Sequence, residues 1–300
     1  MSTTLVMKKA PFSVPIVGSL ARRFISMRID AQLERYRPHV RFSIENKRYL
    51  VKMAENGRDL REVLRLRHAV FYEELLKKRH PLGLDLDRFD MRCDHLMIIE
   101  QATGRCVGTY RFNCSLFTRE FYTATEFDIR EILQLPGVKV ELGRACVHPD
   151  HRTGSVIMLL WKGIAQYAAQ TGARWLFGCS SVKTMDIDDL VALHGYFSFY
   201  HAGNGVVRSR PNRRFRIRQF DEYYRFISSI GGIDEARATA LISPLLKAYL
   251  KVGAVVLGEP IIDRHFKCAD FLTLLDMERI DERTGGKYEV PSSCRETQAA

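Results

Sequence analysis

The 300-residue sequence has no run of about 20 apolar residues, which is the length that a helix needs to cross a bilayer. It also has no Cys-x-x-Cys pair, and its 7 cysteines are scattered along a chain long enough to bury a core without disulfides. Its 20 glycines and 10 prolines are ordinary usage, which excludes collagen-like and linker-dominated chains. These absences predict a cytoplasmic protein with reduced thiols.

Acidic side chains are scarce in two segments. Residues 1–52 contain eleven lysines and arginines against three acids, and residues 208–218 contain six arginines and no acid. The whole chain carries a net charge of +11, so the remaining residues are slightly acidic. Such segregation favours contact with an acidic protein or an anionic membrane at defined places, and two solvated faces are the alternative.

Residues 19–37 place Leu20, Phe24, Met27 and Leu33 among arginines at nearly helical spacing. This pattern is typical of a basic amphipathic helix. Such a helix either lies on an anionic membrane or packs its apolar edge against the rest of the protein, and the sequence leaves both open.

From about residue 57, helical and strand patterns alternate, which predicts an α/β sheet. Helices are expected at 59–75, 155–170, 186–200 and 243–250, and strands at 95–100, 106–113, 138–147, 175–179 and 270–277. The first two strands are expected to form a hairpin. Without repeats or a low-complexity linker, the sequence predicts a basic extension at 1–52, one domain at 53–277 and a polar, disordered tail at 278–300.

A tight turn, residues 148–154, leads into the second predicted helix. The free N–H groups and the positive dipole end at a helix start suit a phosphate group. Arg152 would add positive charge, and Thr153 and Ser155 would add hydroxyl groups. Gly154 would let the backbone approach the phosphate closely. Ordinary helix capping explains the same residues, so the turn alone does not decide between the two.

The turn also carries a family resemblance. Residues 146–154, Cys-Val-His-Pro-Asp-His-Arg-Thr-Gly, resemble the pantetheine-phosphate-binding motif of the GNAT acyltransferase superfamily. Further segments resemble the ornithine-acyl-carrier-protein N-acyltransferases, which make lyso-ornithine lipid: 67–74, 87–90, 93–96, 107–111, 141–147, 160–165, 177–181 and 244–250, with Asp263 and Asp270. The resemblance spans about residues 60–277 and implies a GNAT-type mixed sheet flanked by helices.

The related acyl-homoserine-lactone synthases share a sparser set of residues with this sequence: Arg67, Phe71, Asp87, Asp90, Arg111, Glu141 and Arg144. This overlap implies a common transfer of an acyl group from a carrier protein to an amine, and it leaves the amine open. The resemblance implies donor binding by Cys146, Val147, Arg152, Thr153, Gly154, Ser155 and Val156.

One departure from the superfamily motif bears on the donor. Ser155 and Val156 stand where the general motif has a second glycine. The resemblance therefore implies the acyl-phosphopantetheine arm of acyl carrier protein as donor rather than acyl-CoA, and no permanently bound cofactor.

Amide formation needs a base, because the α-ammonium group of an amino acid must lose a proton before it attacks a thioester. Glu141, on the predicted strand 138–147, is the expected base, and an ion pair with Arg144 or Arg111 is the structural alternative. Backbone N–H groups near Cys146 and Val147 would stabilise the oxyanion. No covalent acyl-enzyme is required, so the cysteines are not expected to be nucleophiles.

The resemblance places the acceptor amino acid among Arg67, Phe71, Asp87, Asp90, His95, Arg111 and Arg144. Arginine suits a carboxylate, and aspartate suits an amino group. The alternative for the aspartates is a salt-bridge network that orders the N-terminal helices. His95 either relays a proton or fills the core.

The sequence thus predicts an enzyme that transfers a long fatty acyl group, with or without a 3-hydroxyl, from acyl carrier protein to the α-amine of L-ornithine. Its alternatives are an acyl-homoserine-lactone or other N-acyl amino acid synthase, and a non-enzymatic adaptor that binds membrane or RNA. Residues 208–218 are expected to steer the acidic carrier protein rather than bind nucleic acid. The location is cytoplasmic, with or without peripheral contact at the inner face of the membrane.

No metal site is predicted from the histidines of the turn. His148 and His151 lie near Cys146, but the set lacks a fourth ligand and lies on a turn.

Overall fold

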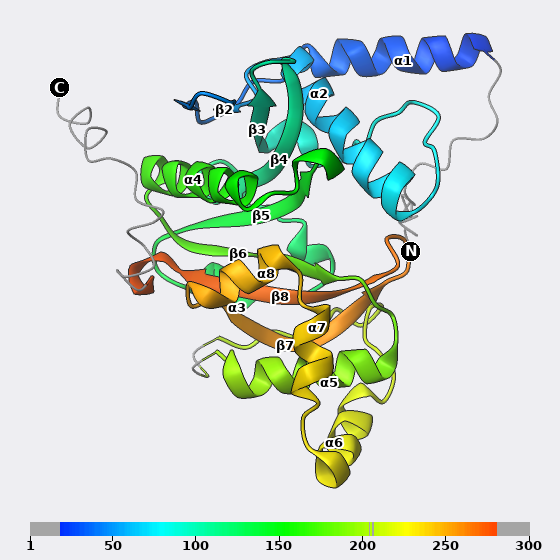
Figure 1. Ribbon diagram of the computed structural model, residues 1–300, viewed down its shortest axis with the longest axis vertical. Helices are drawn as coiled ribbons and strands as arrows, with labels where there is room; N and C mark the ends of the chain where they lie inside the picture. Colours follow the sequence, from blue (N-terminus) through cyan, green and yellow to red (C-terminus); the bar gives the residue numbers. More distant parts are fainter. Residues whose placement is uncertain (1–18, 204, 206, 281–300) are drawn as a thin grey trace, which may run out of the picture.

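A mixed sheet of eight strands forms the centre of the computed structural model, which describes residues 19–203, 205 and 207–280 (Figure 1). The strands lie in the order β1-β2-β3-β4-β5-β6-β8-β7. All neighbouring strands are antiparallel except β5 and β6, which are parallel. The predicted α/β class with a mixed sheet is confirmed.

The elements have the following bounds. The strands are β1 (Ser43–Glu45), β2 (Tyr49–Met53), β3 (Asp94–Glu100), β4 (Arg105–Cys114), β5 (Val138–Val147), β6 (Ala173–Val182), β7 (Val255–Asp263) and β8 (Cys268–Asp276). The α-helices are α1 (Ser19–Leu33), α2 (Gly57–Arg67), α3 (Arg130–Gln134), α4 (Gly154–Thr171), α5 (Ile187–Tyr200), α6 (Phe220–Gly231), α7 (Glu235–Leu241) and α8 (Pro244–Lys251). A π-helical segment, η1 (His68–Leu75), continues α2.

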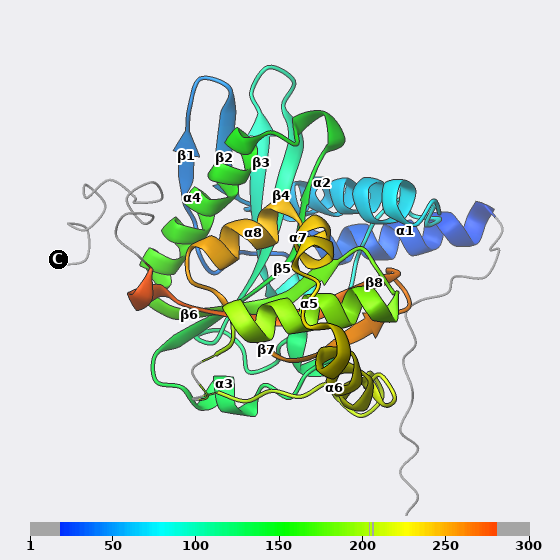
Figure 2. The same ribbon diagram turned by 60° about the horizontal axis from the view of Figure 1, so that its bottom comes forward.

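Helices cover the two faces of the sheet because successive strand residues point to opposite faces. On β3, Leu96 belongs to the same buried cluster as α4, whereas Met97 packs with α2. On β6, Leu176 lies in the cluster on the α4 side, and Phe177 lies in a separate cluster on the other side. Figure 2 shows α4, α5 and α8 in front of the sheet and α1 and α2 behind it.

Local side-chain chemistry sets several helix ends. Asn56, Asp186 and Ser243 accept hydrogen bonds from the first turns of α2, α5 and α8. Gly172 ends α4 with φ of 62°, a left-handed conformation that glycine adopts without strain. These helices and the β3–β4 hairpin confirm the expectations for their segments.

The sheet begins earlier in the chain than expected. β1 and β2 lie within residues 1–52, which the sequence predicts as an extension, and β2 pairs with β3 along its whole length. The boundary between residues 52 and 53 therefore falls inside a strand. The expected tail, 278–300, lies outside the described residues except for 278–280.

The helix predicted in the N-terminal basic segment is α1. Its C-terminal end packs against α2, because Leu33 is buried among Leu60 and Leu64. Phe24 and Met27, nearer its start, are exposed. The side chain of Leu20 lies outside the described residues. None of the helices in the described ranges is both long enough and apolar enough to cross a membrane.

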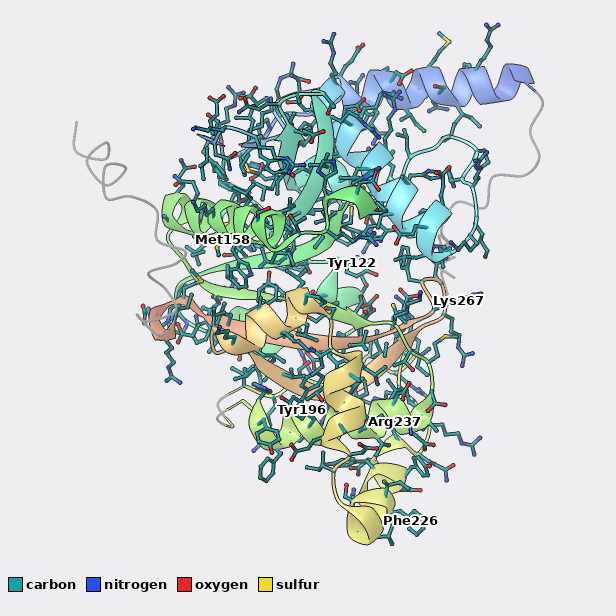
Figure 3. All side chains as sticks on the ribbon, in the orientation of Figure 1. Tyr122, Met158, Tyr196, Phe226, Arg237 and Lys267 are labelled. Carbon is teal, nitrogen blue, oxygen red and sulfur yellow. The ribbon has the colours of Figure 1, made fainter. Side chains whose placement is uncertain are left out.

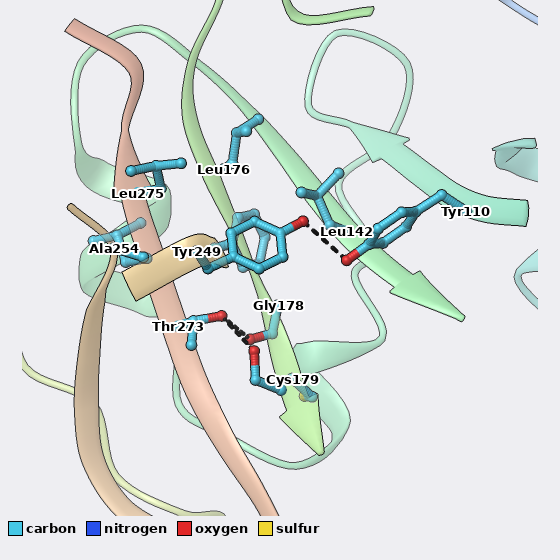
Figure 4. Close-up of a pocket in the computed structure, with 12 residues that line it drawn as sticks. Tyr110, Leu142, Leu176, Gly178, Cys179, Tyr249, Ala254, Thr273 and Leu275 are labelled. Carbon is cyan, nitrogen blue, oxygen red and sulfur yellow. Dashed lines mark hydrogen bonds between the residues drawn. The ribbon is translucent and has the colours of Figure 1, made fainter. Parts of the chain in front are cut away.

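The parallel strands β5 and β6 separate partway along their length. Their pairing ends at Glu141 and Phe177, although β5 continues to Val147 and β6 to Val182. A small cavity lies at this separation, with Leu142 of β5, Gly178 of β6 and Tyr249 of α8 in its lining (Figure 4). Tyr249 shares a hydrogen bond of 2.9 Å with Tyr110 across it.

Gly178 is where a methyl group would interfere with this arrangement. A Cβ atom there would lie 2.2 Å from the backbone oxygen of Leu142, whereas a Cβ at Gly143, on β5, would meet nothing within 4 Å. We expect Gly178→Ala to lower the free energy of unfolding by about 1–3 kcal/mol. Gly143→Ala should leave it unchanged or raise it. Urea unfolding of both variants checks this, and equal losses would contradict it.

Candidate active site

Glu141 stands at the point where β5 and β6 separate. Its carboxylate is buried and accepts hydrogen bonds from the backbone N–H groups of Tyr122 (3.0 Å) and Thr123 (2.6 Å). The side-chain amide of Asn113 is a third donor, at 3.3 Å. All three partners donate, so both oxygens of the Glu141 side chain act as acceptors. The alternative role expected for Glu141, an ion pair with Arg144 or Arg111, is not seen in the described residues.

The segment 120–128, which binds Glu141, is held in place by a second segment, residues 207–216. Its backbone is hydrogen bonded to the segment 207–216: Asn212 N–H to Glu126 O at 2.7 Å, and Asp128 N–H to Arg210 O at 2.9 Å. The side chain of Arg214 adds a bond to Thr125 O. The segment 120–128 is therefore clamped between the sheet and residues 207–216.

Above this segment lies a buried network of three arginines and three aspartates. Arg67 binds Asp90 through two nitrogens and Asp85 through a third, at 2.7 to 3.3 Å. Arg111 binds Asp87 and Asp90 at 2.7 and 2.9 Å. Arg144 completes the set with a bond of 3.2 Å to Asp87.

The network is electrically balanced, with three positive and three negative side chains. Burial opposes ionisation of Asp85 and Asp87, but the neighbouring arginines outweigh it and hold the pKa of both below the ordinary value. Arg67 and Arg111 are almost wholly buried, whereas Arg144 keeps some exposure. Of the three arginines, Arg144 is thus the one that a ligand can reach with the least rearrangement.

Arg144 also connects the two diverging parts of the sheet. It has a positive φ of 53°, and its guanidinium lies 5.1 Å from the ring of Phe266 and 5.5 Å from that of Tyr122. Phe266, in the turn between β7 and β8, contacts Phe71 of η1 edge to face at 5.9 Å. Figure 3 shows Tyr122 and Lys267, which neighbours Phe266, toward the same end of the sheet.

Below Glu141 lies a second set of carboxylates, Glu126, Asp263 and Asp270, which we call the acidic group. Glu126 accepts hydrogen bonds from Tyr122 Oη (2.7 Å) and Cys179 Sγ (3.1 Å). Asp270 accepts one from Ser181 at 2.5 Å. All three are buried, and none forms an ion pair with any described residue. The acidic group thus brings three buried carboxyl groups together without an ion-pair partner among the described residues.

Burial shifts two members of the acidic group, Glu126 and Asp270, toward their protonated forms. It raises the pKa of Asp270 to about 7, with the charge of Glu126 as the next cause, and it also raises the pKa of Glu126. Burial, followed by the charges of Glu126 and Asp270, raises the pKa of the Cys179 thiol. The charge of Glu141 also raises the pKa of this thiol. Cys179 therefore lies near the carboxylates of Glu126, Asp270 and Glu141.

Asp263, Asp270 and Cys268 bring potential ligand atoms within 4.8 Å of one another. Asp263 already accepts hydrogen bonds from the N–H groups of His265 and Phe266, and Asp270 from Ser181. A buried site with two carboxylates held by N–H and O–H donors suits an ammonium group, which supplies its own donors.

The predicted donor-binding residues lie at the start of α4. The N–H groups of Gly154 and Ser155 have no hydrogen-bond partner among the described residues, and the Thr153 and Ser155 hydroxyls lie 2.8 Å apart. Arg152, in contrast, is paired through two nitrogens with Glu74 of η1, at 2.6 and 2.5 Å. Cys146 and Val156 are buried, and Val147 is half-buried. The helix start is free to bind an anion, but Arg152 must share its charge with Glu74.

His95 lies against Asp90 of the arginine–aspartate network, and the histidines of the turn contact one another and Tyr49. Burial lowers the pKa of His95 to about 4, and its Nε2–H donates to Asp90 O at 2.9 Å. Its other nitrogen, Nδ1, is buried without a partner in the described chain. His151 bonds to Tyr49 Oη at 3.1 Å and stands 5.9 Å from His148, ring to ring.

Sequence reasoning missed Glu126, Tyr122 and Cys179 as site residues. They reach the site because the segment 120–128 crosses the sheet and residues 207–216 hold it there. No periodic pattern marks such a segment. Asp263 and Asp270 were noted only through the family resemblance, and their location beside Cys179 requires the fold.

The segment 208–218 contacts both sides of the sheet. Phe215 packs with Phe177 and Phe127, whereas Ile217 packs against the buried cluster on the α4 side. All six of its arginines are exposed. The steering of a carrier protein by these arginines stays a prediction.

Comparison with known proteins gives three kinds of similarity. A family model for the acetyltransferase (GNAT) domain matches residues 66–162. An L-ornithine N(alpha)-acyltransferase of Rhodobacter capsulatus is 31% identical, covering 78% of this chain and 92% of that protein. Another, from Rhizobium meliloti, is 32% identical, covering 81% and 87%.

Among solved structures, a CoA-dependent acyl-homoserine lactone synthase, BjaI, aligns with a TM-score of 0.42 at 16% identity, covering 78% of this chain and 83% of that one. A GNAT-family acetyltransferase from Bacillus anthracis aligns with a TM-score of 0.36 at 9% identity, covering 79% and 99%.

The raised pKa of Asp270 predicts a pH dependence of stability. Since it is about 7 in the folded protein against an ordinary 3.8, the folded state binds more protons between these values. The free energy of unfolding should therefore fall as the pH rises through this range. Asp270→Asn removes this contribution. In urea unfolding, the free energy of unfolding of the variant should therefore rise relative to that of the wild type between about pH 5 and about pH 8. Parallel curves for the two proteins would contradict the assignment.

Proposed function

Because the chain belongs to the L-ornithine N(alpha)-acyltransferase family, we propose that it transfers a long fatty acyl group from a phosphopantetheine thioester to the α-amine of ornithine. It is an acyltransferase of GNAT type. The single observation that carries the acceptor assignment, besides the family, is the acidic group: buried carboxylates without a cation, beside Glu141.

The thioester arm would lie along the free edge of β5. Beyond Glu141 this edge no longer pairs with β6, so its backbone groups can bond to the amides of a pantetheine arm as a strand would. The arm's phosphate would bind the N–H groups of Gly154 and Ser155. The single phosphate of acyl carrier protein fits this short cradle, and we propose it as the donor in preference to acyl-CoA.

Glu141 would act as the base toward the α-amine. It lies where the free edge of β5 begins, next to the expected thioester carbonyl, and three donors hold its carboxylate in position. The oxyanion forms on the carbonyl beside Glu141, so it would be stabilised by backbone N–H groups of the free edge close to Glu141. Cys146 and Val147, which the sequence analysis expected in this role, lie too far along the strand. The reaction forms an amide and releases the thiol of the arm, which takes up the proton.

Both the arginine–aspartate network and the acidic group would bind the acceptor. Ornithine carries a carboxylate and a second ammonium group on its side chain. The acidic group would bind this side-chain ammonium, and Arg144, the most accessible arginine of the network, would bind the carboxylate. The fully buried pairs of Arg67 and Arg111 with Asp90 would hold Arg144 and Asp87 in place.

The base assignment predicts a large loss of turnover in Glu141→Gln, of about 10²-fold or more in kcat, because general-base catalysis contributes about this much. Glu126→Gln, which alters the neighbouring carboxylate, should reduce kcat less. The measurement is steady-state kinetics with acyl carrier protein and ornithine on variants whose folding is verified by circular dichroism. A larger kcat loss in Glu126→Gln would move the base to Glu126.

The acceptor assignment predicts a change of specificity in Asp270→Asn. Loss of a buried charge partner should raise KM for ornithine about tenfold or more. It should change KM little for norvaline, which lacks the side-chain ammonium. Asp276→Asn is the matched control, since Asp276 lies on the same strand but pairs with Arg174 at the far end. Equal KM changes for both amino acids would remove the acidic group from acceptor recognition.

A further inference from the structure

α6 stands at the lower end of the molecule, away from the centre of the sheet (Figures 1 and 2). Its inner side is anchored: Phe220 is buried, Tyr223 Oη donates to Asp188 at 2.7 Å, and Tyr224 packs against a histidine of α5. These contacts hold the helix in a fixed position against α5.

The outer side of α6 is apolar in its second half. Phe226 is 58% exposed and Ile230 is 68% exposed, and a spacing of four residues places them side by side on one helix face. Figure 3 shows Phe226 at the lower end of the molecule. Two large apolar side chains thus face outward at the tip of the structure.

Positive charge lies directly before α6. The exposed arginines of the segment 208–218 form no ion pair with any residue in the described part of the chain, and the segment ends two residues before the helix. Residues 208–230 contain seven arginines and two acids, Asp221 and Glu222, and Asp221 is paired with Arg225. The chain that leads into α6 is therefore strongly basic.

The same segment is connected to the site by apolar packing. Phe215 and Val207 pack against a buried cluster that includes Phe127 and Leu272 and reaches Phe177, where β5 and β6 separate. Continuous apolar packing thus leads from the separation of the strands to the arginine segment.

We propose that the arginine segment, 208–218, and the outer side of α6 form a membrane-contact face that binds an anionic phospholipid bilayer. Arginines would bind lipid phosphates while Phe226 and Ile230 enter the boundary between headgroups and acyl chains. An acidic carrier protein would match the charge but not the exposed apolar pair. The proposal extends beyond the proposed function and does not depend on the acceptor.

The test measures co-sedimentation of the full-length protein with vesicles of phosphatidylcholine mixed with phosphatidylglycerol, and with vesicles of phosphatidylcholine alone. We expect binding to the anionic vesicles only. The double variant Phe226→Ser/Ile230→Ser should bind about tenfold less tightly or worse. Arg213→Ser/Arg218→Ser, which alters two exposed arginines that make no bond to the segment 120–128, should also bind less tightly at low salt. This difference should shrink as salt rises, because salt screens exposed charges.

α1 provides the matched control. It exposes Phe24 and Met27 to a similar degree, 61% and 68%, at the opposite end of the molecule (Figure 1). Phe24→Ser/Met27→Ser should bind the vesicles as the wild type does. Wild-type binding by the α6 variant, or an equal loss in the α1 variant, would overturn the proposal.

Kinetics with soluble substrates separates a protein partner from a membrane. The α6 and arginine variants should keep the wild-type kcat, and also the wild-type KM for acyl carrier protein, in the absence of vesicles. A raised KM for the carrier protein with unchanged vesicle binding would assign this face to the carrier protein instead.

Discussion

The loss of pairing between β5 and β6 after Glu141 and Phe177 is the constraint on which the site depends. Two parallel strands that remained paired would satisfy each other's backbone groups and leave no edge for a substrate. The separation instead exposes the edge of β5, opens the space that Tyr110 and Tyr249 border, and places Glu141 at its inner end. The backbone N–H groups of Tyr122 and Thr123 then bind Glu141, so the segment 120–128 crosses the sheet at this point.

Two charged sets on either side of Glu141 differ in what they require of a ligand. The network of Arg67, Arg111 and Arg144 with three aspartates is neutral and internally paired, so its residues are stabilised without a substrate. The acidic group has no such partner, and burial disfavours its charge. The neutral network can orient its own side chains, whereas carboxyl groups without an ion-pair partner favour a cationic ligand. The sequence placed acceptor recognition wholly in the first set, and our proposal adds the second.

The predictable parts of the fold are those with local signals. β5 has the predicted bounds, and Asp186 and Gly172 mark the ends of α5 and α4 as capping residues do. β7 was missed because Gly258 and Pro260 interrupt its pattern, and the strand carries an irregularity there, between Leu257 and Ile261.

The site was predictable only where residues carry a family pattern. Glu141 and the arginines were named in advance, but Asp85, Glu126 and Tyr122 enter through contacts between segments far apart in the chain. The roles of the named residues also depend on such contacts. Arg152 was expected to offer its charge to a phosphate, and its pairing with Glu74 depends on where η1 lies relative to the turn before α4.

The unpaired acidic group explains how one site can both lower stability and raise selectivity. Keeping Glu126 and Asp270 buried favours their protonated forms, and ionising them near neutral pH costs free energy in the empty site. A bound ammonium group offsets this cost, so part of the binding free energy comes from relief of an unfavourable state of the free protein. A neutral amino acid offers no such relief, because it leaves the carboxylates buried without a partner. Under the proposed acceptor assignment, selectivity for a second ammonium group would follow from the lack of an ion pair to these carboxylates among the described residues.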